Sequence, residues 1–198
     1  MTDSPVLKVN YGDMPGMKSK TQLFFKNLEW GINIKSNTMY LTYEIEQDTL
    51  YAVTTRFDNF IQHNEGKDIN LIISSYGGDV YSMLGIIDYF KSLSVKVNTH
   101  CLGACMSAAA VILACGTGNR TITKNSTVMV HEGSAFESGK TSDVLKGADH
   151  LKKLQSNINR IMAEVTGKDQ EFWDKVSQHD TYLTAEECLD YGIVDEII

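Results

Sequence analysis

The chain has 198 residues, enough for one domain with a sizeable core, and its 42% hydrophobic and 22% charged content is ordinary for a globular protein. A net charge of −7 argues against nonspecific binding to nucleic acid. The apolar runs are too short to span a membrane, and the first residues lack the basic and apolar regions of a signal peptide. A cytoplasmic protein is therefore expected.

The first 35 residues are expected to form an irregular N-terminal segment, because proline and glycine interrupt them and no clear periodicity appears. Residues 36–198 are expected to form a single domain in which strands and helices alternate. A short strand at 38–42 comes first. The helix after it can be capped by Asp48 and carries apolar residues on one face.

The apolar run 69–74 is typical of a buried parallel strand, and 79–93 is the helix expected after it. Further strands are predicted at 95–101, 121–123 and 128–131, and further helices at 107–114 and 141–165. Near the C-terminus, Thr184 to Glu187 fits a capping box and Gly192 a helix end. This alternation predicts βαβ units and a largely parallel sheet.

Three polar side chains lie in contexts that suit a hydrolytic relay. Ser107 lies where a strand, a loop and a buried helix are predicted to meet, His131 closes a β-rich run, and Asp180 precedes a Thr-Tyr-Leu segment. A serine hydroxyl is a poor nucleophile unless a neutral imidazole takes its proton and a third group orients that imidazole. Activity is therefore expected to fall in acid, where imidazoles take up a proton.

Each of these residues also has an ordinary structural interpretation. Ser107 can pack at the start of a small-residue helix, His131 can be a satisfied residue at a strand end, and Asp180 can cap a turn. Other side chains compete on composition alone, namely the other four histidines and the carboxylates of Asp174 and Asp190. Chain order does not decide between them, because such relays occur in several orders on unrelated folds.

Cys105 is a rival nucleophile. It stands two residues before Ser107, in a Gly-x-Cys-x-Ser pattern loosely like a nucleophile elbow, and a thiol is intrinsically the better nucleophile. The alternative is that Cys105 is a small packing residue, as free cysteine in an apolar stretch commonly is. The four cysteines match no common zinc spacing, so neither a metal site nor structural disulfides are expected.

Five segments stand in order along the chain: Ser-Tyr-Gly-Gly-Asp-Val-Tyr at 75–81, Gly-Ala-Cys-Met-Ser at 103–107, Met-Val-His at 129–131, Asp-Thr-Tyr-Leu-Thr-Ala-Glu-Glu at 180–187, and Tyr-Gly-Ile-Val-Asp at 191–195. Together they resemble the ClpP family, the proteolytic subunits of the Clp protease. In that family the matching motifs are a Ser-Pro-Gly-Gly-x-Val turn, a Gly-x-Ala-x-Ser nucleophile segment, a strand ending in Met-Ile-His, an Asp before aromatic-Leu-Ser/Thr-Ala-Glu-Glu, and a closing Tyr-Gly-Leu-Ile/Val-Asp. The similarity runs almost without gaps from about Met39 to the C-terminus and is weakest before it.

The resemblance implies an α/β fold of the ClpP and crotonase-like type, in which repeated βαβ units carry a long handle helix at 141–165. It implies a serine peptidase with Ser107 as nucleophile, His131 as base and Asp180 as the acid that orients the base. This chemistry requires no metal and no small cofactor.

The same resemblance assigns the oxyanion hole to the backbone amides of Gly78 and Ala108. Glycine at 77–78 lets backbone approach a substrate closely, and it also suits a tight turn between strand and helix. Two side chains depart from the family pattern: Tyr76 stands where proline is usual, and Ala108-Ala109 stand where Met-Gly is usual. The backbone donors survive these changes, whereas the shape of the pocket can alter.

The implied assembly is a homo-oligomer of two stacked heptameric rings that encloses the active sites. Its implied partner is a AAA+ unfoldase that spends ATP and feeds unfolded polypeptides through an axial pore. The sequence has no P-loop, so the ATPase is expected on a separate chain. After His131, the residues Glu132-Gly133 stand where the family usually has Gln-Pro, which bears on peptide specificity and on contacts between rings.

Three alternatives stay open. An acyl-CoA hydratase or isomerase of the same fold superfamily would use the two oxyanion amides without the three polar side chains. An inactive ring-forming regulatory subunit would have lost one of those side chains, and none is lost here. A specialised peptidase that processes a single substrate would keep them all.

Overall fold

The computed structural model describes residue 27 and residues 31–63, 66–134 and 138–198. The N-terminal segment up to residue 26, and residues 135–137 of the segment after His131, lie outside the described residues. The strands are β1 (Ile32–Asn33), β2 (Thr38–Leu41), β3 (Ile69–Ser75), β4 (Val97–Met106), β5 (Arg120–Ile122), β6 (Thr127–Val130), β7 (Thr181–Leu183) and β8 (Glu196–Ile197). The helices are α2 (Gln47–His63), α3 (Val80–Ser92), α4 (Ala108–Ala114), α5 (Thr141–Thr166), α6 (Gln170–Val176) and α7 (Ala185–Asp190), with a 3₁₀ turn at Ile34–Ser36.

The strands form a mainly parallel sheet in the order β1-β2-β3-β4-β5-β8, with β6 paired to β4 and β7 paired to β6. β4 changes its neighbour along its length, since its first half pairs with β5 up to Cys101 and its second half pairs with β6 from Ala104. Only the β1–β2 and β6–β7 pairs are antiparallel among the described strands. The predicted α/β architecture is confirmed.

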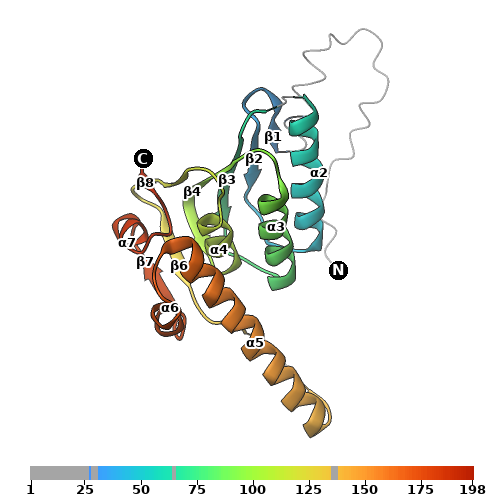
Figure 1. Cartoon of the computed structure of the whole chain (residues 1–198), viewed down its shortest axis with the longest axis vertical. Helices are drawn as coiled ribbons and strands as arrows, with labels where there is room; N and C mark the ends of the chain where they lie inside the picture. The colour runs from blue at the N-terminus through green and yellow to red at the C-terminus, as the bar shows by residue number, and fades with distance from the viewer. Residues whose placement is uncertain (1–26, 28–30, 64–65, 135–137) are drawn as a thin grey trace.

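Helix α4 lies at the centre of the molecule, and all seven of its residues are buried. Its first three residues are alanines, and such small side chains let a helix pack closely against the sheet and the neighbouring helices. Figure 1 shows α2 and α3 beside the sheet and α4 close to β4. Because α4 begins directly after Ser107, the best-packed element of the fold fixes the position of that residue.

The long helix α5 extends away from the rest of the molecule over its N-terminal half (Figure 1). Its buried residues, Asn159, Ile161 and Met162, all lie in its C-terminal half. Leu145, near the start of the helix, is by contrast 62% exposed. Among the described residues, none of the helices has the length and apolar character needed to cross a membrane.

Three local predictions are corrected. Helix α2 begins at Gln47, so Asp48 lies in its first turn and does not cap it. In the same turn, the Thr49 hydroxyl accepts the Glu46 N–H at 3.1 Å. β4 does not end at Cys101 but continues to Met106, and the regular structure of residues 32–36 replaces the irregular segment expected there.

Arg120 joins the ends of three helices to the C-terminal strand. Its Nη1 donates to the carbonyls of Ala114 (3.2 Å), Val165 (3.1 Å) and Gly192 (2.9 Å), which lie at or just beyond the ends of α4, α5 and α7. Its Nε donates to Asp195 at 3.0 Å, and hydrogen bonds from Arg120 lower the pKa of that carboxyl. Arg120→Met is expected to cost about 2–3 kcal/mol, because it orphans three carbonyls and a carboxylate.

Urea unfolding measures this loss, with Arg160→Met as the matched control. Arg160 pairs with Glu164 on the surface of α5, where both side chains are about half exposed, so its loss is expected to cost less than about 1 kcal/mol. Since the pKa of Asp195 is lowered in the folded state, its interaction with Arg120 contributes to the free energy of unfolding at neutral pH. This contribution is lost as the pH falls below about 4. Equal losses for the two variants would contradict this role of Arg120.

Candidate active site

The register of three adjacent strands brings the three candidate residues to one edge of the sheet. β4 and β6 run parallel with Met106 opposite Met129, so Ser107 directly follows β4 beside the end of β6. β6 and β7 run antiparallel with Val130 opposite Thr181, so the residue after β6 faces the residue before β7. Those residues are His131 and Asp180. Strand pairing thus gathers side chains that lie 24 to 73 positions apart in the sequence.

Ser107 occupies a strained backbone position. Its φ of 53° and ψ of −124° are unusual for a residue other than glycine, and strain of this kind costs about 1–3 kcal/mol. The Ser107 N–H donates to Met129 O at 2.8 Å, which ties the turn to β6. The strained turn, held between strand β4 and the buried helix α4, is the geometry of a nucleophile elbow, which presents a side chain outward.

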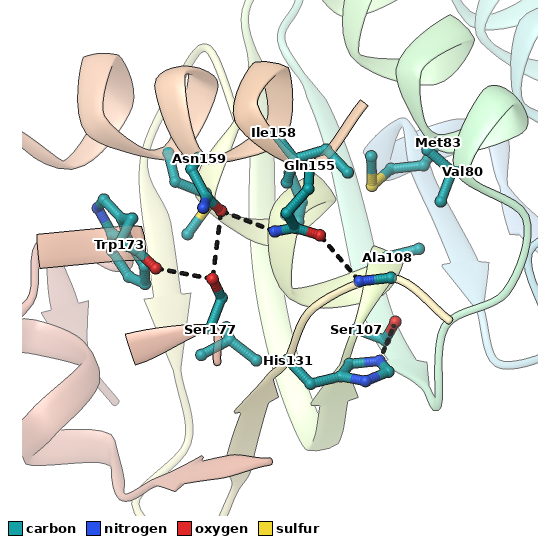
Figure 2. Close-up of a pocket in the computed structure, with 14 residues that line it drawn as sticks. Val80, Met83, Ser107, Ala108, His131, Gln155, Ile158, Asn159, Trp173 and Ser177 are labelled. Atoms are coloured by element: carbon teal, nitrogen blue, oxygen red, sulfur yellow. Dashed lines mark hydrogen bonds between the residues drawn. The ribbon is translucent and has the colours of Figure 1, made fainter. Parts of the chain in front are cut away.

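The hydroxyl of Ser107 and the imidazole of His131 are in hydrogen-bond contact. Their Oγ and Nε2 atoms are 2.8 Å apart, and Figure 2 shows the two side chains pointing toward each other. The side chain of His131 is 25% exposed, so the pair is partly shielded from water. A base at this distance and on this nitrogen can take the hydroxyl proton directly.

Asp180 lies on the other side of His131 but does not bond to it. Its Oδ1 is 3.8 Å from Nδ1 of His131, beyond hydrogen-bond range, and its side chain is 65% exposed. It faces an open groove that also contains Glu132, Gln178 and His179. The structure therefore brings the serine and the histidine into contact and leaves the carboxylate loosely placed.

This looseness sets the expected size of an Asp180 substitution. In a closed relay, replacing the aspartate by asparagine costs about 10⁴-fold in rate, because the imidazole takes the wrong tautomer. With an exposed carboxylate at 3.8 Å, Asp180→Asn is expected to cost about 10- to 100-fold in peptide hydrolysis. Asp190→Asn is the matched control and should retain the full rate. A 10⁴-fold loss would mean that the carboxylate closes onto His131 when substrate binds.

Three of the four other histidines, and the carboxylate of Asp174, bond elsewhere. His63 contacts Asn59 O, His100 contacts the Thr121 hydroxyl, and His150 contacts the Tyr81 hydroxyl. Burial also lowers the pKa of His100. Asp174 accepts a hydrogen bond from Asn159, and Asp190 is the last residue of α7.

The glycine pair after β3 packs directly against the Ser107 turn. A Cβ on Gly77, whose φ is +101°, would lie 2.8 Å from the Ser107 Cβ and 3.0 Å from the Ala108 nitrogen. Ile45 holds the pair in place, because its N–H donates to Gly77 O at 2.8 Å and its carbonyl accepts the Asp79 N–H at 2.6 Å. The N–H of Gly78 takes no part in this pairing.

The two amides assigned to an oxyanion hole lie on either side of this contact. The N–H of Ala108 is the first of α4, so it has no partner within the helix. The N–H of Ser107 is already bonded to Met129, which leaves the following amide as the available donor of the turn. Gly78 and Ala108 thus belong to two backbone segments that meet at Gly77.

A narrow cavity of about 40 Å³ adjoins Ser107 and Ala108, with enough room for water. Its apolar wall comes from α3, α4, α5 and α6. The lining residues are Val80, Met83, Val111, Val130, Gly133, Gln155, Ile158, Asn159, Met162, Trp173 and Ser177, besides Ser107, Ala108 and His131. Sequence reasoning missed Gln155 and Asn159, although two polar residues inside the apolar stripe of a helix are a signal of a polar contact.

Cys105 does not share this cavity. Its side chain is fully buried, its Sγ lies 3.5 Å from Ile73 O, and burial raises its pKa well above the usual thiol value. A buried, protonated thiol is a poor nucleophile. Cys105→Ala is expected to keep the wild-type rate of reaction with a fluorophosphonate and to cost about 1–2 kcal/mol in stability. Loss of that reaction in a folded Cys105→Ala protein would restore Cys105 as the nucleophile.

A mainly parallel α/β sheet with a serine and a histidine in contact at its strand ends defines a hydrolase-like arrangement. Comparison with protein-family models matches residues 29–198 to the Clp protease family. The chain therefore belongs to the Clp protease family, and its α/β fold is of the ClpP and crotonase-like type.

Proposed function

We propose that this chain is the proteolytic subunit of a Clp-type protease and acts as a serine endopeptidase. The observation that carries the proposal is the 2.8 Å contact between Ser107 Oγ and His131 Nε2, at a strained turn between strand β4 and the buried helix α4. Membership of the Clp protease family supports a peptidase in general. The serine-type mechanism, the substrates and the partner are the proposal.

In the proposed mechanism, Ser107 Oγ attacks the scissile carbonyl while His131 Nε2 takes its proton. The carbonyl oxygen becomes negative and is stabilised by the amides of Gly78 and Ala108, each of which can contribute roughly 3–4 kcal/mol. His131 then gives the proton to the leaving amine as the peptide C–N bond breaks. Water, deprotonated by His131, hydrolyses the acyl-enzyme and releases Ser107.

Asp180 has a supporting part in this mechanism. Its negative charge favours the imidazolium form of His131 that arises while the tetrahedral intermediate exists. The 3.8 Å separation gives this interaction the character of a through-space ion pair. The proposal therefore assigns most of the rate enhancement to the serine–histidine pair and to the two amides.

We further propose that the chain works as a homo-oligomer of two stacked heptameric rings, fed with unfolded polypeptides by a separate AAA+ unfoldase. The projecting half of α5, with Leu145 62% exposed, supports a second chain packing there. Enclosing the site would restrict access to unfolded chains, so a folded substrate would first have to be unfolded by the ATP-driven partner.

Hydrolysis assays test this function. The oligomer is incubated with short fluorogenic peptides without ATP, and with a folded fluorescent protein in the presence of ATP and a AAA+ ATPase recovered by affinity capture. We expect ATP-independent cleavage of peptides and ATP-dependent loss of the folded protein. A fully assembled oligomer that cleaves no peptide would contradict the proposal, and turnover of acyl-CoA thioesters would favour the crotonase-type alternative.

A further inference from the structure

A chain of side-chain amides leads from the segment after His131 to helix α6. The Gly133 N–H donates to Gln155 Oε1 at 2.8 Å, and Gln155 Nε2 donates to Asn159 Oδ1 at 2.9 Å. Asn159 Nδ2 then donates to Asp174 Oδ1 at 2.7 Å. Figure 2 shows Gln155 and Asn159 on α5, lying in line across the cavity beside Ser107.

The two ends of the chain fix its direction. A backbone N–H can only donate, so the carbonyl end of Gln155 must face Gly133, and an ionised carboxylate can only accept, so the amino end of Asn159 must face Asp174. Every link thus runs the same way and ends on a negative charge, an arrangement in which hydrogen bonds strengthen one another. Asn159 is only 5% exposed, which makes each of its bonds costly to lose.

The chain holds a part of the backbone that has no regular structure of its own. β6 ends at Val130, and residues 131–134 lie in neither a strand nor a helix. Their placement therefore depends on contacts such as the one from Gln155 to Gly133, two residues beyond His131. Gln155 and Gly133 also line the cavity with Ser107 and His131, so a shift of this segment would move the imidazole relative to the hydroxyl.

We propose that Gln155, Asn159 and Asp174 form a positioning chain that fixes the backbone after His131 and so keeps His131 Nε2 on Ser107 Oγ. The effect on catalysis rests on the proposed function, whereas the effect on the backbone does not. Asp174, which sequence reasoning weighed as a rival acid, instead anchors the far end of the chain. None of these three residues touches the reacting atoms, so they are positioning residues.

The fixed direction of the chain allows a test by reversal. Gln155→Glu replaces a donor by a carboxylate oxygen, so two acceptors face each other at Asn159 Oδ1. If the Asn159 amide turned around, its oxygen would instead face the Asp174 carboxylate, and two acceptors would meet there. Asp174→Asn keeps an acceptor for Asn159 and removes only the charge. In the double variant, Asn159 can turn around, donate to the new carboxylate at position 155 and accept from the new carboxamide at position 174. The double variant should therefore hold Gly133 more firmly than Gln155→Glu alone.

Two measurements on the intact protein read this out. Hydrogen–deuterium exchange of the peptide containing Gly133 should rise about tenfold in Gln155→Glu, little in Asp174→Asn, and return to within about threefold of wild type in the double variant. The rate of fluorophosphonate labelling of Ser107 should fall and recover in the same order. Gln62→Glu, the same substitution at an exposed site on α2, is the matched control and should change neither measurement.

The outcomes separate this inference from the proposed function. The positioning chain would be overturned if hydrogen–deuterium exchange at Gly133 did not change in Gln155→Glu, or did not recover in the double variant. In either case, labelling of the wild-type protein would leave the serine mechanism intact. If hydrogen–deuterium exchange followed the expected order but the rate of Ser107 labelling stayed unchanged, the chain would hold Gly133 without positioning His131, and that part of the inference would be overturned. A wild type that does not label at all would overturn the serine mechanism, and the exchange order would still decide whether the chain holds Gly133.

Discussion

Replacing Ser107 by alanine is expected to reduce peptide hydrolysis by about 10⁴- to 10⁶-fold, because the acyl-enzyme route disappears with the hydroxyl. The substitution removes the hydroxyl that His131 contacts and leaves the backbone unchanged, so no attacking group remains beside the imidazole. Alanine accepts the φ of 53° about as well as serine does, and all of α4 stays buried behind it, so the fold should persist. Steady-state cleavage of a fluorogenic peptide measures the loss.

Ser142→Ala is the matched control for this experiment, because Ser142 lies exposed in the first turn of α5, in the half of that helix that extends away from the rest of the molecule. Circular dichroism and native mass spectrometry should show that both variants fold and assemble like wild type. A Ser107→Ala protein that still hydrolyses peptides at a tenth of the wild-type rate or more would exclude Ser107 as the nucleophile.

Gly77→Ala is expected to have the second largest effect, although the residue carries no side chain. A Cβ there would meet Met106 O at 2.7 Å and the Ser107 Cβ at 2.8 Å, and the φ of +101° is itself unfavourable for alanine. Met106 O is backbone and the Ser107 turn is already strained, so neither neighbour can move cheaply. We expect at least a 100-fold loss of peptide hydrolysis and about 2–4 kcal/mol of stability.

Gly167→Ala separates the collision from the backbone strain. Gly167 follows α5 with a φ of +74°, and a Cβ there would meet no atom within 4 Å. Gly167→Ala should lower the free energy of unfolding by about 1 kcal/mol and leave peptide hydrolysis unchanged. If Gly77→Ala behaved like Gly167→Ala in both urea unfolding and peptide hydrolysis, the close packing of the glycine pair on the nucleophile turn would have no functional part.

Much of the fold could be predicted, because several segments carry strong local signals. The apolar run of β3, the regular spacing of α5 and the small-residue run of α4 place those elements to within about two residues. Thr184 and Glu187 form the predicted capping box, and Gly192 follows the end of α7 with a φ of +78°. In these cases local preference and tertiary packing agree.

Other elements depend on pairing that a single sequence does not reveal. β4 reads as if it ended at Cys101, because Leu102 and Gly103 interrupt the pattern, yet it continues to Met106 after a register shift against β3. The continuation exists because β6 replaces β5 as its neighbour. The short strands β1 and β8 likewise owe their existence to neighbours in the sheet.

The candidate site was predictable in its chemistry and not in its contacts. Ser107, His131 and Asp180 stand in recognisable local contexts, and the strand register accounts for their meeting. The looseness of Asp180 and the packing of Gly77 on the nucleophile turn are properties of distance, which composition and spacing cannot supply. The hydrogen-bonded chain through Gln155 and Asn159 likewise depends on distances that the sequence does not give.

The most direct test of the central claim is reaction of the folded, assembled wild-type protein with a fluorophosphonate, followed by intact-mass measurement and peptide mapping. An activated serine reacts because a base removes its proton at the moment of attack, whereas other surface serines do not. We expect one adduct per chain, located on Ser107. No adduct, or an adduct on any other residue, would contradict the claim that Ser107 and His131 form a working nucleophile–base pair.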